Sequence, residues 1–123
     1  MAALKMAGTE KNEIDFFELH DAYAVIAALS LEALGFAKPG KACDLAADGE
    51  IFSTGRIPIS TFGGLKARGH ALGASGIYQT VEAYLQLSGK AGLNTLTKKP
   101  RIGLVQSIGG TASTVISHIL ERT

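Results

Sequence analysis

The sequence predicts an α/β domain, and three observations lead to this prediction. A β-rich run at residues 14–20 is followed at once by an apolar helical segment at 23–36. A second segment with helical spacing of apolar residues covers 74–88. Two further β-patterned runs, 102–108 and 114–120, are joined by a short glycine-containing turn, which predicts an antiparallel hairpin at the end of a mixed sheet.

Length and composition fit one globular domain over residues 1–123. Hydrophobic residues make up 46% of the chain, and 12 Lys and Arg against 11 Asp and Glu leave a net charge of +1. We therefore expect no nucleic-acid partner, which would require a basic excess. No apolar run reaches the roughly 18 residues of a membrane span and no signal-peptide pattern is present, so no membrane partner is expected. A single cysteine, Cys43, excludes an internal disulfide and a multi-cysteine zinc site, and predicts a cytoplasmic location.

The first elements are short. Residues 1–7 are good helix formers and Gly8 is placed to end them, so we expect the last turns of a helix that begins before Met1. The run 14–20 is expected to be a strand. Asp21 stands where this strand ends, and its carboxylate is expected to cap the helix that follows.

The helix at 23–36 carries Glu32 as its only charge. A helix that is apolar on nearly all sides is usually buried on all sides, so this one requires packing partners above and below. A chain of this length cannot readily build two sheets around one helix. We therefore expect a missing partner, which is either another chain or a removed half.

The middle of the chain is rich in glycine and proline. Residues 37–60 are expected to form a long loop, a feature that is uncommon inside compact domains and is often functional. Five glycines follow between 62 and 76, and a second helix is expected from about Ala74 to Ser88. Along this helix Ile77, Val81 and Leu85 line one side, and Gln79, Glu82 and Gln86 face elsewhere.

The three histidines differ in the sites that they predict. Their separations match no local metal-binding motif, so no metal site is expected. His118 lies inside an alternating strand and is expected to be half-buried in the sheet. His20 ends a strand, and the carboxyl ends of strands are where α/β sheets bind ligands; the alternative is a surface histidine beside a capping aspartate.

His70 lies in a glycine-rich segment, 69–76, directly before a helix. Free N–H groups and the positive end of the helix dipole at such a position suit an anion or an oxyanion. The spacing is that of neither a Walker loop nor a dinucleotide fingerprint. Lys66 and Arg68 are either ligands for an anionic substrate or solvated loop charges.

Two nucleophile candidates lack the surroundings that reactivity requires. Ser107 is in Gln-Ser-Ile-Gly, which is not the Gly-x-Ser-x-Gly elbow of serine hydrolases. Cys43 has nothing in its sequence context that lowers a thiol pKa. We expect this cysteine to be incidental.

Four segments in the same order resemble the C-terminal half of the thiolase superfamily, closest to the archaeal acetyl-CoA acetyltransferases and the sterol-carrier-protein-type thiolases. They are Glu-Leu-His-Asp-Ala-Tyr at 18–23, Gly-Gly-Leu-Lys-Ala-Arg-Gly-His at 63–70, Gly-Ala-Ser-Gly at 73–76 and Ser-Ile-Gly-Gly at 107–110. The resemblance implies half of a five-layer α-β-α-β-α fold and acyl transfer to coenzyme A. It also implies that the half with the nucleophilic cysteine lies outside this chain, and that the domain is incomplete at its N-terminus.

The resemblance assigns catalytic roles to two histidines. His70 matches the histidine of the family's Gly-His-Pro motif, which activates the nucleophile and helps to form an oxyanion hole; Ala71 replaces the proline. His20 matches a polar residue that orients a water molecule or the substrate carbonyl. The substrate-binding glycines are expected to be Gly69, Gly109 and Gly110.

One catalytic group of the family has no counterpart. The cysteine that removes the α-proton in Claisen condensation would stand at Ala22 or Ser107 in this sequence. A serine hydroxyl without an adjacent base is a poor proton acceptor near neutral pH. Two functions therefore stay open: a portion or subunit of a thiolase-type acyltransferase, and a non-catalytic thiolase-like protein that binds acyl-CoA or serves as a scaffold.

The expected partners follow from both functions. They are an N-terminal thiolase half and coenzyme A or acyl-CoA as substrate, with no permanently bound cofactor. A homo-oligomer is also expected, and a purely structural dimerisation module is a third possible role. Exposure of the face that normally meets the missing half would promote association.

Overall fold

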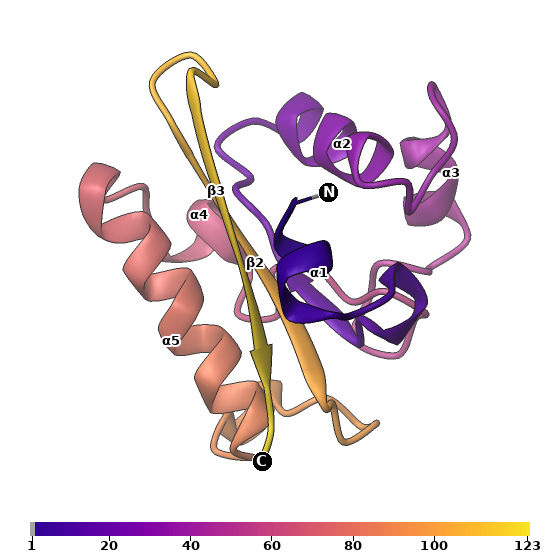
Figure 1. Ribbon diagram of the computed structural model, residues 1–123, viewed down its shortest axis with the longest axis vertical. Coiled ribbons are helices and arrows are strands. Elements are labelled where there is room, and N and C mark those ends of the chain that lie inside the picture. The colour runs from indigo at the N-terminus through magenta and orange to yellow at the C-terminus, as the bar shows by residue number, and fades with distance from the viewer. Residues whose placement is uncertain (1) are drawn as a thin grey trace.

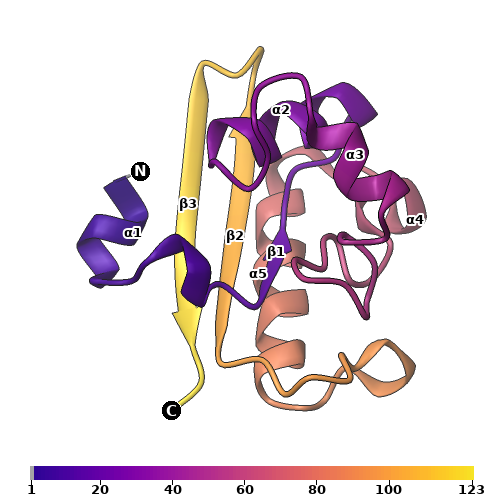
Figure 2. The same ribbon diagram turned by 90° about the vertical axis from the view of Figure 1, so that its right-hand side faces the viewer.

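The computed structural model describes residues 2–123, which form a mixed three-stranded sheet with helices on both faces (Figures 1 and 2). The strand order is β1 (Phe16–Glu18), β2 (Ile102–Gly109), β3 (Thr114–Glu121). β1 pairs with β2 in parallel, and β2 pairs with β3 antiparallel along its whole length. The predicted α/β class and C-terminal hairpin are confirmed. The helices are α1 (Ala2–Ala7), α2 (Ala24–Ala33), α3 (Ala42–Ala47), α4 (Gly64–Arg68) and α5 (Ser75–Leu87).

The helices form two layers around the sheet. Figure 1 shows the sheet edge-on, with α5 on one face and α1, α2 and α3 on the other. Adjacent residues of a strand point to opposite faces, so Phe16 packs with Ala83 and Leu87 of α5, whereas Phe17 packs with Leu31 of α2. Each face of this short sheet therefore has its own hydrophobic core.

The first helix agrees with the prediction for residues 1–7, although Met1 lies outside the described residues. Helix α1 ends at Ala7, and Gly8 has the positive φ of +63° that glycine adopts after a helix. The helix contacts β3 and buries none of its residues. No helix of the described residues is long and apolar enough to cross a membrane.

The segment 37–60 is not a simple loop, so this prediction is wrong. It contains α3, and its last residues pair with β1 on the side away from β2. Phe17 N–H donates to the Pro58 carbonyl at 2.8 Å, and Ser60 N–H donates to the Phe17 carbonyl at 3.1 Å. Ile57 is fully buried in the core beneath α2. Glycine and proline between these short elements concealed them in the sequence pattern.

Helix α2 is covered on one side only by this chain, which agrees with the expectation that its other side requires a packing partner. Ser30 and Leu31 are buried, but Val25 is 61% exposed and Leu29 is 53% exposed. The physical reason is that this chain supplies one sheet, and that sheet covers one side of the helix.

Helix α5 buries polar side chains and exposes apolar ones. Gln79, Glu82 and Gln86 are buried, whereas Ile77 and Val81 are exposed. The Gln86 amide nitrogen donates to Thr61 Oγ1 at 2.9 Å and to the Asn94 carbonyl at 2.8 Å, and its oxygen accepts from Leu96 N–H at 3.1 Å. Because these partners satisfy the amide, burial of this glutamine carries little penalty.

Candidate active site

The two histidines that the sequence singles out meet in space. His20 follows β1 and His70 follows α4, 50 residues later in the chain. Their ring centroids are 5.1 Å apart, and the rings are edge-to-face with an interplanar angle of 78°. The amino end of α5 and the tip of the β2–β3 hairpin lie at the same end of the sheet (Figure 1).

A cavity of about 570 Å³ surrounds the histidine pair. The hairpin supplies one wall, and the segments after β1 and after α4 supply the others. Most of the predicted site residues are therefore brought together, and their chemical roles stay predictions. The lining residues are His20, Ala22, Tyr23, His70, Leu72, Gly73, Ser107, Ile108, Gly109 and Gly110.

Gly69 is not among the lining residues. It ends α4 with a φ of +89°, in the left-handed region that favours glycine. Its position serves the turn that leads to His70. Gly69 is thus placed beside the expected substrate site without lining it.

His70 is held by the first residue of α5. Its Nδ1 lies 2.8 Å from the hydroxyl oxygen of Ser75, which is fully buried. In the tautomer in which Nδ1–H donates to Ser75, the Nε2 lone pair is free to accept a proton. This is the form that a general base requires.

The surroundings of His20 favour its neutral form. Its side chain is only 4% exposed, and its Nδ1 is buried with no hydrogen-bond partner among the described residues. Burial, and after it the neighbouring His70, lower the pKa of His20 below its usual value of 6.5. With Nδ1 buried, a neutral His20 in the Nε2–H tautomer has one N–H donor for a bound ligand.

Helix α4 is fixed at both ends before the chain reaches His70. At its start, Leu65 N–H donates to Asp21 Oδ1 at 3.0 Å, so Asp21 caps α4 and not the helix that directly follows it in sequence. A side chain at Gly64 would collide with this carboxylate. Asp21 thus links the strand that delivers His20 to the helix that delivers His70.

At the other end of α4, Arg68 pairs with Glu82 of α5. Its Nε lies 2.9 Å from Glu82 Oε1, and a second guanidinium nitrogen lies 3.2 Å from Oε2. The guanidinium carbon is also 5.7 Å from the centre of the Tyr78 ring. Arg68 is therefore occupied within the fold and is not a solvated loop charge, whereas Lys66 is exposed.

Sequence reasoning missed Glu18, which lies behind the site. Its side chain is 1% exposed, and its Oε1 accepts hydrogen bonds from the N–H and the hydroxyl of Thr61. Burial raises the pKa of Glu18 to about 7, against the lowering effect of the Thr61 bonds. The signal that could have found it is a charged residue between Phe17 and Leu19 in an apolar run.

Cys43 and His118, the remaining residues that the sequence analysis considered, lie outside the histidine cavity. Cys43 is exposed on α3 and does not line the histidine cavity. His118 is exposed on the edge strand β3, so the prediction of a half-buried residue is wrong: none of the described residues covers that position. Among the described residues no three His, Cys, Asp or Glu side chains are grouped as metal ligands would be.

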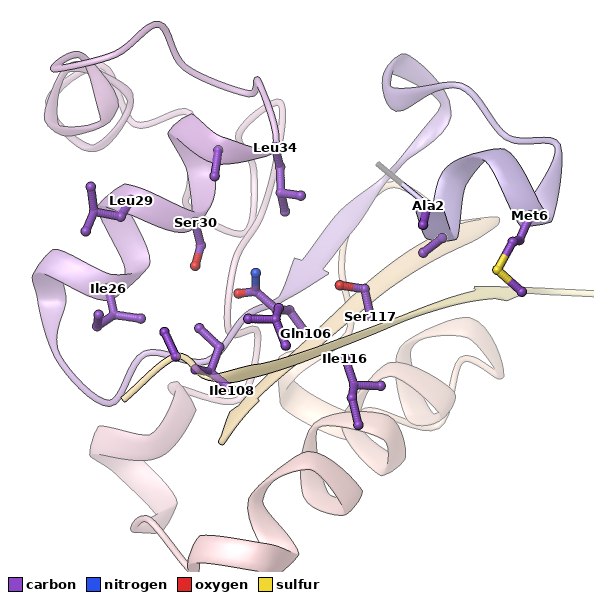
Figure 3. A pocket seen from close by; sticks show the side chains of 14 residues that line it. Ala2, Met6, Ile26, Leu29, Ser30, Leu34, Gln106, Ile108, Ile116 and Ser117 are labelled. Atoms are coloured by element: carbon purple, nitrogen blue, oxygen red, sulfur yellow. The ribbon is translucent and has the colours of Figure 1, made fainter. Parts of the chain in front are cut away.

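A second, larger cavity of about 640 Å³ lies between α1, α2 and the hairpin. Figure 3 shows Ser30 of α2 and Gln106 of β2 facing each other across it. Its walls are mainly apolar, and none of the residues from 2 to 123 that line it has a titratable side chain. Because the histidine cavity brings two imidazoles together and the described walls of the larger cavity supply no such group, the histidine cavity is the candidate active site.

The fold and the cavity together define an α/β domain with a candidate ligand site at the carboxyl ends of two parallel strands. The chain belongs to the thiolase C-terminal domain-like family, whose model matches residues 1–122. This agrees with the resemblance that the four sequence segments indicated.

Individual relatives support the same family. The chain is 42% identical, over 98% of its length, to acetyl-CoA acetyltransferase of Methanothermobacter thermautotrophicus. It is 43% identical over 72% of its length to sterol carrier protein 2 of Gallus gallus. A solved structure described as an Ltp2-ChsH2(DUF35) aldolase superimposes over 98% of the chain with a TM-score of 0.82 and 28% identity. The chain spans 31%, 16% and 30% of the lengths of these three proteins, respectively.

Proposed function

We propose that this chain is the C-terminal portion or subunit of a thiolase-type acyltransferase, an acetyl-CoA acetyltransferase or β-ketoacyl-CoA thiolase. The observation that carries the proposal is the meeting of His20 and His70 in one cavity, with ring centroids 5.1 Å apart. Membership of the thiolase C-terminal domain-like family and 42% identity to an acetyl-CoA acetyltransferase support it. The proposed substrate is an acyl thioester of coenzyme A.

The geometry supports a division of labour between the two imidazoles. His70, oriented by Ser75, activates a nucleophilic thiol by accepting its proton at Nε2. His20, kept neutral by burial, donates a hydrogen bond toward the thioester oxygen or toward a bound water molecule. A donor preorganised at a developing oxyanion contributes about 3 kcal/mol to the stabilisation of a transition state.

The nucleophilic thiol in this proposal comes from an N-terminal thiolase half. The exposure of Cys43 on α3, away from the histidine cavity, supports an external source. The exposed apolar side chains Val25 and Leu29 on α2, and Ile77 and Val81 on α5, support association with that half or with further copies of the chain. The proposed location is the cytoplasm, and the proposed process is the metabolism of acyl-CoA in lipid pathways.

A second function is favoured by two positions in the cavity. Ala22 and Ser107 both line it, and they stand where the resemblance implies the acid/base cysteine of condensation. Without a thiol at either position, a non-catalytic thiolase-like protein that binds acyl-CoA or supports a partner enzyme accounts for the same fold. Both functions predict binding of acyl-CoA, and only the first predicts turnover of it.

The test combines this chain with a cysteine-bearing N-terminal thiolase half and measures thiolysis of acetoacetyl-CoA. His70→Ala is expected to abolish turnover, whereas His118→Ala, which removes an exposed histidine from β3, is the matched control and should leave turnover unchanged. Equal turnover by the wild-type and His70→Ala assemblies would contradict the acyltransferase. Binding of coenzyme A in calorimetry without turnover by the wild-type assembly would select the second function.

A further inference from the structure

Gln79 joins the two strands that deliver the walls of the histidine cavity. It lies on α5 with 0% of its surface exposed. Its amide nitrogen donates one hydrogen bond to the Glu18 carbonyl at 3.2 Å and a second to the Gln106 carbonyl at 2.8 Å. Glu18 ends β1, and Gln106 belongs to β2.

These bonds lie at the point where the two parallel strands part. The pairing of β1 with β2 ends at Glu18 opposite Val105, and β2 then continues as part of the hairpin. The chain reaches His20 two residues after the Glu18 carbonyl, and it reaches Ser107 one residue after the Gln106 carbonyl. The side chain of Gln79 therefore bonds to both strands directly before the two segments that line the cavity.

The same face of α5 also contacts the third segment that lines the cavity, the one that contains His70. Ser75 and Gln79 are four residues apart, so they project from one side of the helix, and both are fully buried. Ser75 bonds to His70, and Gln79 bonds to the backbone that leads to His20 and Ser107. One turn of one helix thus contacts all three segments of the cavity.

The orientation of the Gln79 amide is set by its partners. Two carbonyl oxygens require the nitrogen, and this leaves Oε1 buried with no hydrogen-bond partner among the described residues. An apolar side chain of similar size would fill the same volume without leaving a desolvated oxygen, so a glutamine is not needed here for packing alone. The unpaired oxygen therefore argues that the two bonds to the strands are the reason for a glutamine.

We infer that Gln79 is a positioning residue for the proposed acyl transfer: it sets the separation of His20 from the Ser107–Gly110 wall and, with Ser75, fixes both relative to His70. This inference rests on the proposed function for its effect on rate. Its structural part, the placement of the histidines by α5, stands on the hydrogen bonds alone.

The test compares Gln79→Met with Gln86→Met, which is a matched control in the same helix. Gln86 is also a buried double donor, but its partners Thr61, Asn94 and Leu96 lie outside the lining of the histidine cavity. In the assembly with the cysteine-bearing half, Gln79→Met is expected to lower kcat by about tenfold to a hundredfold, because small displacements of catalytic groups have effects of that size. The KM for coenzyme A should change by less than about twofold in both variants, and kcat of Gln86→Met should equal that of wild type.

A second readout does not require activity. The ring-proton resonances of His20 and His70 in the 123-residue chain, followed by NMR through a pH titration, report their mutual placement. Gln79→Met is expected to shift the His20 titration and to weaken the contact between the two rings, and Gln86→Met is expected to do neither. If the wild-type assembly shows no turnover, the proposed function fails and this titration alone decides the inference.

Two results would overturn it. One is a Gln79→Met variant whose kcat and histidine resonances match those of Gln86→Met. The other is loss of folding in both Gln79→Met and Gln79→Asn while Gln86→Met stays folded, which would make Gln79 a folding residue only. Where Gln79→Met alone fails to fold, Gln79→Asn decides in the same terms, since it keeps the amide but shortens its reach.

Discussion

Helices α2 and α5 lie on opposite faces of one sheet, and each departs from the usual relation between polarity and burial. Helix α2 is apolar nearly throughout, yet Val25 and Leu29 are exposed. Helix α5 buries Gln79 and Gln86 and exposes Val81. The difference shows that burial of apolar side chains on α2 is limited by the surface that the chain provides for packing. Burial of polar side chains on α5 is made possible by their hydrogen-bond partners. The candidate site is built on the helix with buried polar groups.

The largest expected effect comes from the covered side of α2. Leu31 is 3% exposed and belongs to the core that contains Phe17. Leu31→Ala should lower the free energy of unfolding by about 2–5 kcal/mol, because it removes buried methyl groups and leaves a cavity. Urea unfolding of the chain measures this. A loss below about 1 kcal/mol would show that α2 is not packed on the sheet as described.

Glu18, behind α5, should produce the next largest effect, and this effect depends on pH. The pKa of Glu18 in the folded chain, about 7, lies above the ordinary glutamate value of 4.5 that applies to the unfolded chain. Between these two pH values the folded chain binds more protons than the unfolded chain, so stability falls as pH rises through that range. Glu18→Gln keeps an acceptor for Thr61 and removes the buried charge. The variant should match wild type below pH 4.5 and exceed its stability above pH 7 by on the order of 2–3 kcal/mol.

The difference between the two unfolding curves is the quantity to measure for Glu18, because other titrating groups are common to both proteins. His20 is one of them, and its lowered pKa makes stability fall as pH drops below 6.5, opposite in sign to Glu18. A stability difference that does not change between pH 5 and pH 8 would contradict the buried carboxyl.

The buried amide of α5 should give an intermediate effect. Gln86→Met removes three hydrogen bonds and leaves the Leu96 N–H and the Asn94 carbonyl without this partner. We expect the free energy of unfolding to fall by about 1–3 kcal/mol. Unchanged stability would mean that the hydrogen bonds of Gln86 do not stabilise the chain. Hydrogen-bond partners would then not explain why α5, unlike α2, buries polar side chains.

The smallest effect is expected on the exposed side of α2. Leu29→Ser replaces a side chain that is 53% exposed, so the stability of the chain should change by less than about 0.5 kcal/mol. Light scattering of the same variant should report less self-association than wild type, since an exposed apolar side chain is removed. A destabilisation comparable to that of Leu31→Ala would show that Leu29 is covered.

Local patterns predicted the hairpin and α5, and they singled out His20 and His70 as candidate site residues without showing that the two share a cavity. They did not predict that Asp21 caps α4 or that Gln79 bonds to Glu18, because these contacts join residues 44 and 61 positions apart. A side chain that bonds to distant backbone leaves no periodic signal in its own segment. For the same reason the buried side of α5 could not be identified from polarity, whereas α3 was missed because it is short and is flanked by glycine and proline.

The central claim is that His20 and His70 form one site, and an NMR titration of the chain tests it most directly. We expect ring-to-ring contacts between the two histidines and a His20 pKa below 6.5. We also expect His70→Ala to raise the His20 pKa, because a neighbouring imidazole is removed, while burial still keeps that pKa below its usual value. Rings without mutual contacts, and a His20 pKa that has its usual value and is unchanged by His70→Ala, would show that the two histidines do not form one site.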